Sequence, residues 1–380
     1  MKLEHLNEYL FAKHSIVPGT QKSSIEDISR DHIGLHAARI MTPYTTLASR
    51  LENYNPQMLM DQLYKDRNLT KLRAMRTTLH IAPHDIADMM HTATLGIRTA
   101  GSKSFFNKND ITLEQINGIW QQIRPQLAEL NTGRDLESLI ASHIAKSGDD
   151  PAIAKQVLKY LWETGELSYV NAATDWEKED RRYAVTSDYY PDLKLGGLSQ
   201  DEARERLARE YIKRFGPATA KDFGWWSGLG AGGFNNLVQQ GGGYEKVKCD
   251  NSELEFYIEA GEVDRLMGYQ PRQDNWVAMT AFEDPSLKGY KESRGRYVSP
   301  ENYDKLFNKI GEVRAGIIHN GQAIGTWTWD KKSKQVVVDF FTQPPQEIQQ
   351  QVMELKQKYD AILGMQNQSG EQLTLEQGGI

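Results

Sequence analysis

The chain repeats one local arrangement, in which helices are followed by two short strands, and this repetition limits the folds that it can adopt. In the first copy, apolar periodicity predicts helices over residues 2–13 and 24–35, and the pair Thr42-Pro43 favours the start of another. Two short strands are expected over 69–76 and 78–82. Helices followed by a small hairpin are typical of a helix-turn-helix with a β-wing.

Two further copies of this arrangement follow along the chain. The second runs from 135 to 186, with a long polar wing over 171–182 between its strands, and the third runs from 199 to 258. Three tandem winged-helix units therefore account for the first two thirds of the sequence.

Beyond residue 270 the pattern changes to strands. Residues 313–319 and 322–329 are separated by Asn320-Gly321, the pair favoured in a type I′ turn, and a third strand is expected over 334–341. An amphipathic helix over 344–363 and a polar, loose tail should follow. We predict an α+β fold in which tandem winged-helix units precede a small antiparallel β-barrel or meander. The expected divisions are 1–130, 131–197 and 198–268 for the three winged-helix domains, 269–343 for the β domain, and 344–380 for the C-terminal helix and tail.

Composition excludes several classes of protein. The sequence contains no run of eighteen apolar residues, so no membrane contact is expected, and Met1–His5 carries charges where a signal peptide needs an apolar stretch. A single cysteine, Cys249, excludes an internal disulfide framework and a thiolate zinc cluster. We expect a cytoplasmic monomer that associates with the nucleoid when it is bound to DNA.

The charge distribution singles out the N-terminal third. The net charge of −6 argues mildly against a nonspecific nucleic-acid binder. However, residues 1–110 hold 14 Lys and Arg against 11 Asp and Glu, whereas residues 342–380 hold 2 against 5. Seven of the nine histidines also lie within the first 91 residues. The N-terminal third is therefore the part expected to face an anion.

Basic side chains gather in both predicted wings and near residue 290. Strand alternation places Lys71 and Arg73 on one face of the first wing, and a wing of this kind can reach a minor groove or phosphates. The alternative for each group is a solvated face with no partner. The residues predicted to contact double-stranded DNA are Arg39, Lys71, Arg73, Arg76, Arg181, Arg182, Lys291, Arg294 and Arg296.

Two other motifs do not indicate a cofactor or metal site. Residues 228–233 match GxGxxG, but a helix start rather than an apolar strand precedes them, which favours a turn between helices over a dinucleotide loop. His32 and His36 have the spacing of metal ligands on one helix face, yet no carboxylate or thiol at a diagnostic spacing completes the set. We therefore predict neither a cofactor nor a metal ion.

Five short motifs occur in order over nearly the whole chain. They are Gly34-Leu35-His36-Ala37-Ala38, Tyr44 to Arg50, Arg73 to His80, Gly216 to Thr219 with Trp225 to Leu229, and Gly325-Thr326-Trp327. Together they resemble the AlkZ-like winged-helix DNA glycosylases. The resemblance implies tandem winged helices with a C-terminal β-barrel that clasp duplex DNA, and removal of alkylated purines, including crosslinked ones.

The same resemblance locates the catalytic positions. In the family's Gln-x-Gln or Gln-x-Asp pattern the first position falls on His36 and the second on Ala38. Such enzymes stabilise an oxocarbenium-like sugar and place a water to attack it. A neutral His36 can accept a hydrogen bond from that water, whereas Ala38 cannot. Arg39 is a poor substitute because a cation opposes the developing positive charge, and His80 is a candidate helper on proximity alone.

Three interpretations follow from these residues. The first is a monofunctional glycosylase that hydrolyses the N-glycosidic bond of N7-alkylated purines in duplex DNA, with His36 positioning water. The second is a non-catalytic winged-helix protein that binds DNA as a damage sensor or transcriptional regulator. The third uses the winged units for protein contacts, which suits the acidic net charge.

Overall fold

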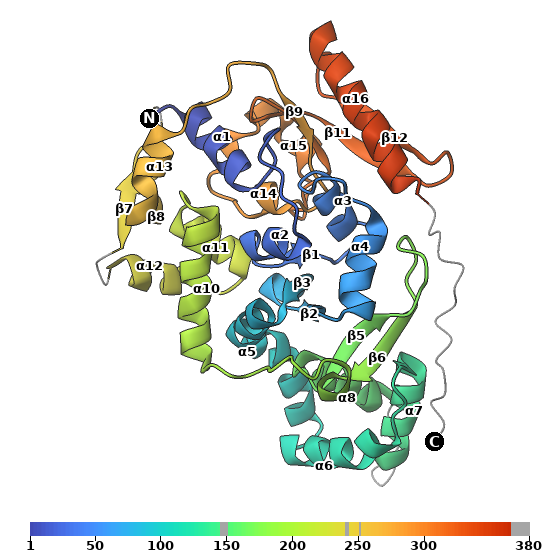
Figure 1. Ribbon diagram of the computed structural model, residues 1–380. Coiled ribbons are helices and arrows are strands. Elements are labelled where there is room, and N and C mark those ends of the chain that lie inside the picture. Colours follow the sequence, from blue (N-terminus) through green and yellow to red (C-terminus); the bar gives the residue numbers. More distant parts are fainter. Residues whose placement is uncertain (145–150, 240–242, 251, 366–380) are drawn as a thin grey trace.

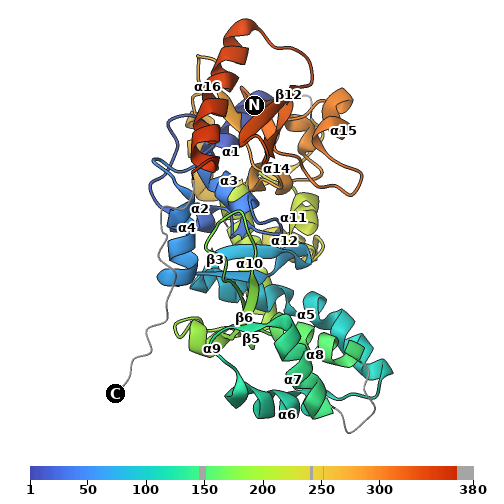
Figure 2. The same ribbon diagram turned by 90° about the vertical axis from the view of Figure 1, so that its right-hand side faces the viewer.

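The computed structural model describes residues 1–144, 151–239, 243–250 and 252–365, so the tail predicted to be loose lies mostly outside the described residues. Helices and small antiparallel sheets make up the fold, which confirms the α+β class (Figure 1). Helix α16 and the helices α6 to α8 lie at opposite ends of the molecule (Figures 1 and 2). No described helix is both long and apolar enough to cross a bilayer.

The N-terminal segment places a short strand where a helix was expected. Helix α2 ends at Asp31, not at residue 35, because Ile33 and Gly34 both adopt left-handed conformations, with φ 49° and 88°. The next two residues pair as strand β1, Leu35–His36, so the predicted helix end was wrong. The elements here are α1 Leu3–Lys13, α2 Ile25–Asp31, β1, α3 Thr42–Ala48 and α4 Pro56–Met60, continued by a π-helical turn Asp61–Lys65.

Strand β1 forms the edge of a three-stranded sheet with β3, Leu79–Pro83, and β2, Leu69–Arg73, in the order β1-β3-β2. The predicted strand over 69–76 ends early, because Met75–Thr77 form a 3₁₀ turn in which Arg76 has φ 52°. This turn directs Arg76 away from the strand and towards the third repeat, where its guanidinium contacts Trp225.

The lower part of the molecule in Figure 1 contains helices that the sequence patterns missed. Its core surrounds Phe106 and Trp120, which lie on α5 and α6, while α7 and α8 pack against the sheet β4-β6-β5. The bounds are α5 His84–Lys108, α6 Leu113–Ile123, β4 Asn131–Thr132, α7 Gly133–Ile144, α8 Pro151–Glu163, β5 Leu167–Asn171, β6 Arg181–Val185 and α9 Thr186–Tyr189.

The third repeat begins with α10, which packs against α5. Capping boxes at Ser199 and Thr219 start α10 and α11, as their sequences predict. Gly228 ends α11 with φ 74°, so the GxGxxG motif begins as a turn between helices. The bounds are α10 Gln200–Phe215, α11 Ala220–Ser227, α12 Gly232–Gln239, β7 Tyr244–Val247, β8 Phe256–Glu259 and α13 Val263–Gly268.

The C-terminal strands form one open four-stranded sheet in the order β12-β11-β10-β9. Asn320 and Gly321 both have positive φ, as a type I′ turn requires. Because the sheet does not close within the described residues, the meander is correct and the barrel was wrong. The bounds are β9 Val277–Met279, α14 Pro285–Lys288, α15 Tyr303–Leu306, β10 Gly316–His319, β11 Gln322–Asp330, β12 Gln335–Phe340 and α16 Gln346–Leu363.

One hydrophobic core joins the two ends of the chain. Leu35 and Ile81 from the first sheet are buried together with Val277 and Ile317 from the last sheet and Ile348 from α16. Burial of apolar surface at this junction brings the loop between β9 and α14 beside β1. The winged-helix character of each repeat and the five domain boundaries stay predictions.

Candidate active site

Two predicted site residues, His36 and His80, are neighbours on adjacent strands of the first sheet. They are direct partners in the antiparallel pairing of β1 with β3, so their side chains lie on the same face. Their ring centroids are 5.5 Å apart and the rings meet edge to face at 87°. His80 Nδ1 lies 3.1 Å from the Thr78 carbonyl oxygen, whereas His36 Nδ1 is buried without a hydrogen-bond partner. The sheet thus aims both imidazoles into one space.

That space is a cavity of about 210 Å³ formed by three distant parts of the chain. The first sheet and the turn after β2 contribute His36, His80 and Arg76. Helix α11 of the third repeat contributes Trp226, and the loop around α14 contributes Glu283 and Lys288. The cavity therefore exists only where the first sheet, the third repeat and the C-terminal β region meet.

Glu283 is an acidic residue of this site that the sequence patterns missed, and Glu312 also lines the cavity. Its carboxylate Oε1 accepts the Val313 N–H at 2.7 Å, and its own N–H donates to the Val313 carbonyl at 2.9 Å. The other oxygen, Oε2, lies 2.8 Å from Lys288 Nζ and 3.9 Å from His36 Nε2. The acidic pair Glu283-Asp284, which begins four residues after the end of β9, is the sequence feature that could have drawn attention to this position.

A buried polar network fixes the loop that carries Glu283. Arg50, at the end of α3, donates from both terminal nitrogens to the Asp284 carboxylate at 2.6 and 2.9 Å. Both side chains are fully buried. Arg50 Nε also lies 3.2 Å from His32 Nε2, and His32 Nδ1 lies 2.7 Å from the Ile28 carbonyl. His32 thus belongs to this network. Among the described residues, no group of three or more His, Cys, Asp or Glu side chains could hold a metal ion.

Burial sets the charge of the two histidines. It lowers the pKa of His36 well below its usual value, and the positive charges of Lys288 and Arg39 and the neighbouring His80 act in the same direction. Burial also lowers the pKa of His80 to about 4, although its hydrogen bond to the Thr78 carbonyl opposes the shift. Both imidazoles are therefore neutral at pH 7, and His36 has a lone pair to offer to a water molecule.

The family is decided by comparison with known proteins. The family model described as DNA glycosylase AlkZ-like matches residues 30–356. The chain belongs to this family. The Streptomyces sahachiroi DNA glycosylase AlkZ has the same fold, with a TM-score of 0.77 and 16% sequence identity over 95% of this chain and 97% of that chain. No curated protein sequence matches. Membership of the AlkZ-like family gives the chain a DNA-glycosylase-like role in DNA repair, with DNA as its partner.

In this AlkZ-like chain, a cluster of four cations surrounds one half-buried tryptophan at the cavity. The guanidinium of Arg76 lies 3.7 Å from the centre of the Trp225 ring, and Lys291 Nζ lies 4.3 Å from it. Arg294 and Lys288 lie 5.3 and 5.5 Å away. We call these five residues the Trp225 cluster. The cluster joins the first predicted wing to the basic stretch near residue 290. The sequence predicted these two as separate surfaces.

Other predicted DNA-contacting residues bind protein groups instead. Lys71 is buried with its Nζ 4.2 Å from the Tyr169 ring centre, and burial lowers its pKa to about 8. Arg73 pairs with Glu163, which also binds Arg98. A buried ammonium on an aromatic face does not reach a phosphate in this conformation. Lys71 therefore does not belong to the proposed DNA surface.

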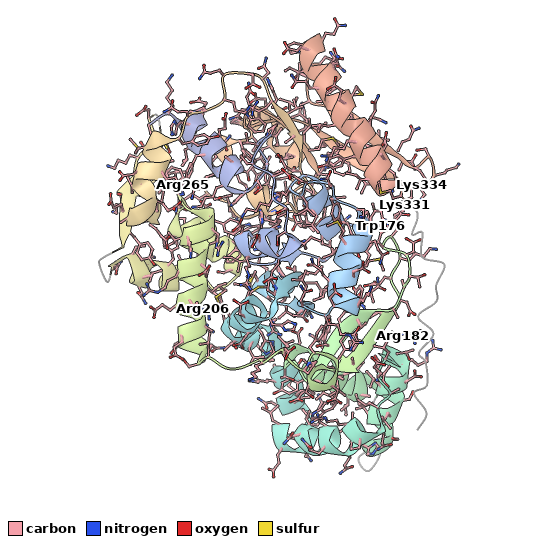
Figure 3. The ribbon with its side chains drawn as sticks, viewed as in Figure 1. Trp176, Arg182, Arg206, Arg265, Lys331 and Lys334 are labelled. Carbon is pink, nitrogen blue, oxygen red and sulfur yellow. The ribbon has the colours of Figure 1, made fainter. Side chains whose placement is uncertain are left out.

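Five more of the predicted arginines have protein partners, and two of these five belong to the second predicted wing. Arg294 and Arg296 are buried: Arg294 donates to the Tyr290 carbonyl, and Arg296 bonds Asn7. Arg39 is exposed over the Phe282 ring and near Glu312. Arg181 and Arg182 pair with Glu179 and Asp180, and Figure 3 shows Arg182 beside β6, near α7. Of these five, only Arg39 is exposed close to the cavity.

Proposed function

We propose that this chain is a monofunctional glycosylase that hydrolyses the N-glycosidic bond of N7-alkylated purines in duplex DNA. One observation supports the proposal: the imidazole of His36, the residue that resembles the family's first catalytic position, lines a cavity, and burial keeps it neutral at pH 7. Neutral His36 suits this chemistry because it accepts a hydrogen bond from the attacking water without adding positive charge beside the sugar.

The substrate class follows from the electronics of the bond that breaks. A purine alkylated at N7 carries a positive charge, so it leaves as a neutral base when the glycosidic bond gives up its electron pair. The enzyme then has to hold a water and stabilise the cationic sugar, rather than protonate the leaving group. No strong acid is needed at the site, which fits two neutral histidines, His36 and His80.

The size of the cavity favours attack by water on a nucleotide whose base is not enclosed by the protein. Its volume of about 210 Å³ lies below the range of roughly 300–1,000 Å³ for pockets that bury a small-molecule ligand. We infer that the cavity admits a water molecule and the edge of a sugar while the base stays at its mouth. A crosslinked purine cannot leave the duplex, so such a site would also accept crosslinked lesions.

The DNA backbone would be held at the cavity by cations with exposed surface. Arg76 and Lys291 belong to the Trp225 cluster. Arg39 lies 3.5 Å from the carboxylate of Glu312, which lines the cavity. Lys291 and Arg39 are exposed, and Arg76 is half-buried. Cations placed around a cavity bind phosphates and position the strand without reading its sequence.

The test is release of 7-methylguanine from N7-methylated duplex DNA with enzyme in excess. We expect release by the wild type, and a fall of about tenfold or more for His36→Ala with unchanged duplex affinity, because one positioned base is lost. His143→Ala, a histidine on α7 far from the cavity, should react like the wild type. Binding without release would favour the non-catalytic DNA-binding protein. Absence of salt-dependent duplex binding would contradict both interpretations.

A further inference from the structure

We propose that Glu283 is the second catalytic residue of this site and takes the role that Ala38 cannot fill. The inference rests on the proposed function, because it concerns the same hydrolysis. The resemblance places the second polar residue of the family pattern at position 38. In this structure, a carboxylate from the loop between β9 and α14 lies opposite His36. Ala38 itself is exposed and has no polar side-chain atom.

The distance between the two side chains suits a shared water molecule. His36 Nε2 and Glu283 Oε2 are 3.9 Å apart, which is too far for a direct hydrogen bond. A water about 2.8 Å from both atoms would see them at an angle of roughly 90°, close to the angle between its two O–H bonds. It would donate one hydrogen to each, and its lone pairs would then face the open side of the cavity.

The backbone holds Glu283 in a conformation that a side chain rarely adopts. Its φ is +55°, in the left-handed region, which costs about 1–2 kcal/mol for a residue other than glycine. Two hydrogen bonds to Val313 and the buried pair of Asp284 with Arg50 keep it there. Such conformations concentrate at functional sites, where the surrounding structure over-determines them.

Lys288 and Val313 together fix the orientation of the Glu283 carboxylate. Its Nζ binds Oε2 at 2.8 Å and also donates to the Gly311 carbonyl at 3.1 Å. Oε1 is engaged by the Val313 N–H, so Oε2 is the oxygen left to face His36. The carboxylate is therefore presented to the cavity in one orientation, as a group that positions water must be.

The step balances without another reactant. The bond between C1′ and the purine nitrogen breaks, and its electron pair goes to the purine, whose positive charge is neutralised. The water oxygen forms the new bond to C1′ while Glu283 stabilises the positive charge on the sugar. The proton that the water loses passes to Oε2 of Glu283 and then to solvent, while His36 holds the other hydrogen during attack.

The experiment compares Glu283→Gln with a carboxylate of matched chemistry. Glu177 also accepts an N–H on Oε1, from Trp329 at 2.9 Å, and a lysine on Oε2, Lys334 at 2.6 Å, but it lies outside the cavity. In single-turnover release of 7-methylguanine, Glu283→Gln should be at least about 100-fold slower, as for loss of a catalytic base, with unchanged affinity for undamaged duplex. Glu177→Gln should stay within about threefold of the wild type.

A second variant separates chemistry from folding. Glu283→Ala leaves space for a small carboxylate, so added sodium formate should raise its rate about tenfold or more and leave the rates of wild type and His36→Ala unchanged. If Glu283→Gln keeps the wild-type rate, or if formate fails to restore any activity to folded Glu283→Ala, the inference is overturned while the proposed function stands. An inactive wild type would instead show that the proposed function itself has failed.

Discussion

Arg50 and Asp284 form a buried, bidentate ion pair that ties the end of α3 to the loop carrying Glu283. Asp284→Asn would leave the Arg50 charge buried without its counter-ion. We expect the free energy of unfolding to fall by about 3–5 kcal/mol, as when one partner of a buried pair is removed. Urea denaturation measures the change.

The control for this prediction is an exposed pair that is also bidentate, although it uses Nε and one terminal nitrogen of its arginine. Asp274 receives two nitrogens of Arg272, at 3.1 and 2.5 Å, but its side chain is 65% exposed. Exposed pairs are screened by water, so Asp274→Asn should leave the urea midpoint unchanged. Equal midpoints for Asp284→Asn and Asp274→Asn would mean that the buried pair does not hold the loop.

Acid should destabilise the protein in part through His80. Its folded pKa is about 4, against about 6.5 for a free histidine, so between these values the unfolded chain binds more protons. The free energy of unfolding therefore falls as the pH drops from 6.5 towards 4, and His80 accounts for about 2 kcal/mol of that loss at pH 5. His80→Gln removes this part, and urea titrations at pH 7 and pH 5 measure it. An equally steep loss in the variant would contradict the assignment.

Lys291 should contribute one phosphate contact. It is the exposed lysine of the Trp225 cluster. In Lys291→Ala the slope of log K against log salt for duplex binding should become shallower by about 1. Fluorescence anisotropy over a range of salt concentrations measures the slope. Lys331→Ala, on the exposed turn between β11 and β12 (Figure 3), serves as the comparison. A slope as steep as that of the wild type would remove Lys291 from the DNA surface.

Gly34 should be more sensitive to substitution than its backbone conformation alone requires. Gly19 and Gly34 have nearly the same φ, +87° and +88°. A Cβ at Gly19 meets nothing within 4 Å, whereas one at Gly34 lies 3.0 Å from Met90 Cε and 3.3 Å from the Ile81 carbonyl. Gly19→Ala should therefore cost about 1–2 kcal/mol of unfolding free energy. Gly34→Ala should cost about 1–3 kcal/mol more, because β1 must move away from β3.

Urea denaturation of both glycine variants tests this difference. Gly34→Ala should also slow base release, since β1 carries His36. Identical stabilities for Gly19→Ala and Gly34→Ala would show that the sheet adapts without cost.

Local patterns predicted the elements whose start and stop signals are made by neighbouring residues. The third repeat begins at residue 199 as expected, where Ser199 caps α10, and Asn320 with Gly321 turns β10 into β11. The pattern failed at α5, a 25-residue helix whose apolar positions face several partners and so show no single stripe. It also failed at Leu35, where pairing with β3 outweighed helical periodicity.

The site was less predictable because its parts meet only in the folded chain. His36 was predicted from a motif and His80 from its expected proximity on the wing, and the structure places them together. The acidic pair Glu283-Asp284 does not by itself mark Glu283 as catalytic. The wing over 171–182 was expected to be long and polar, yet Trp176 packs on Tyr44 with ring centres 5.0 Å apart (Figure 3). A tryptophan in a polar segment was the signal for that docking.

The separation between His36 and Glu283 also has a consequence for synthesis of the protein. The carboxylate is held by Val313, so the two halves of the site come from opposite ends of the chain. A chain growing on the ribosome cannot bring Glu283 into this arrangement with His36 before Val313 has emerged. We therefore expect a translation product that ends before residue 313 to lack the paired arrangement, although it still carries His36.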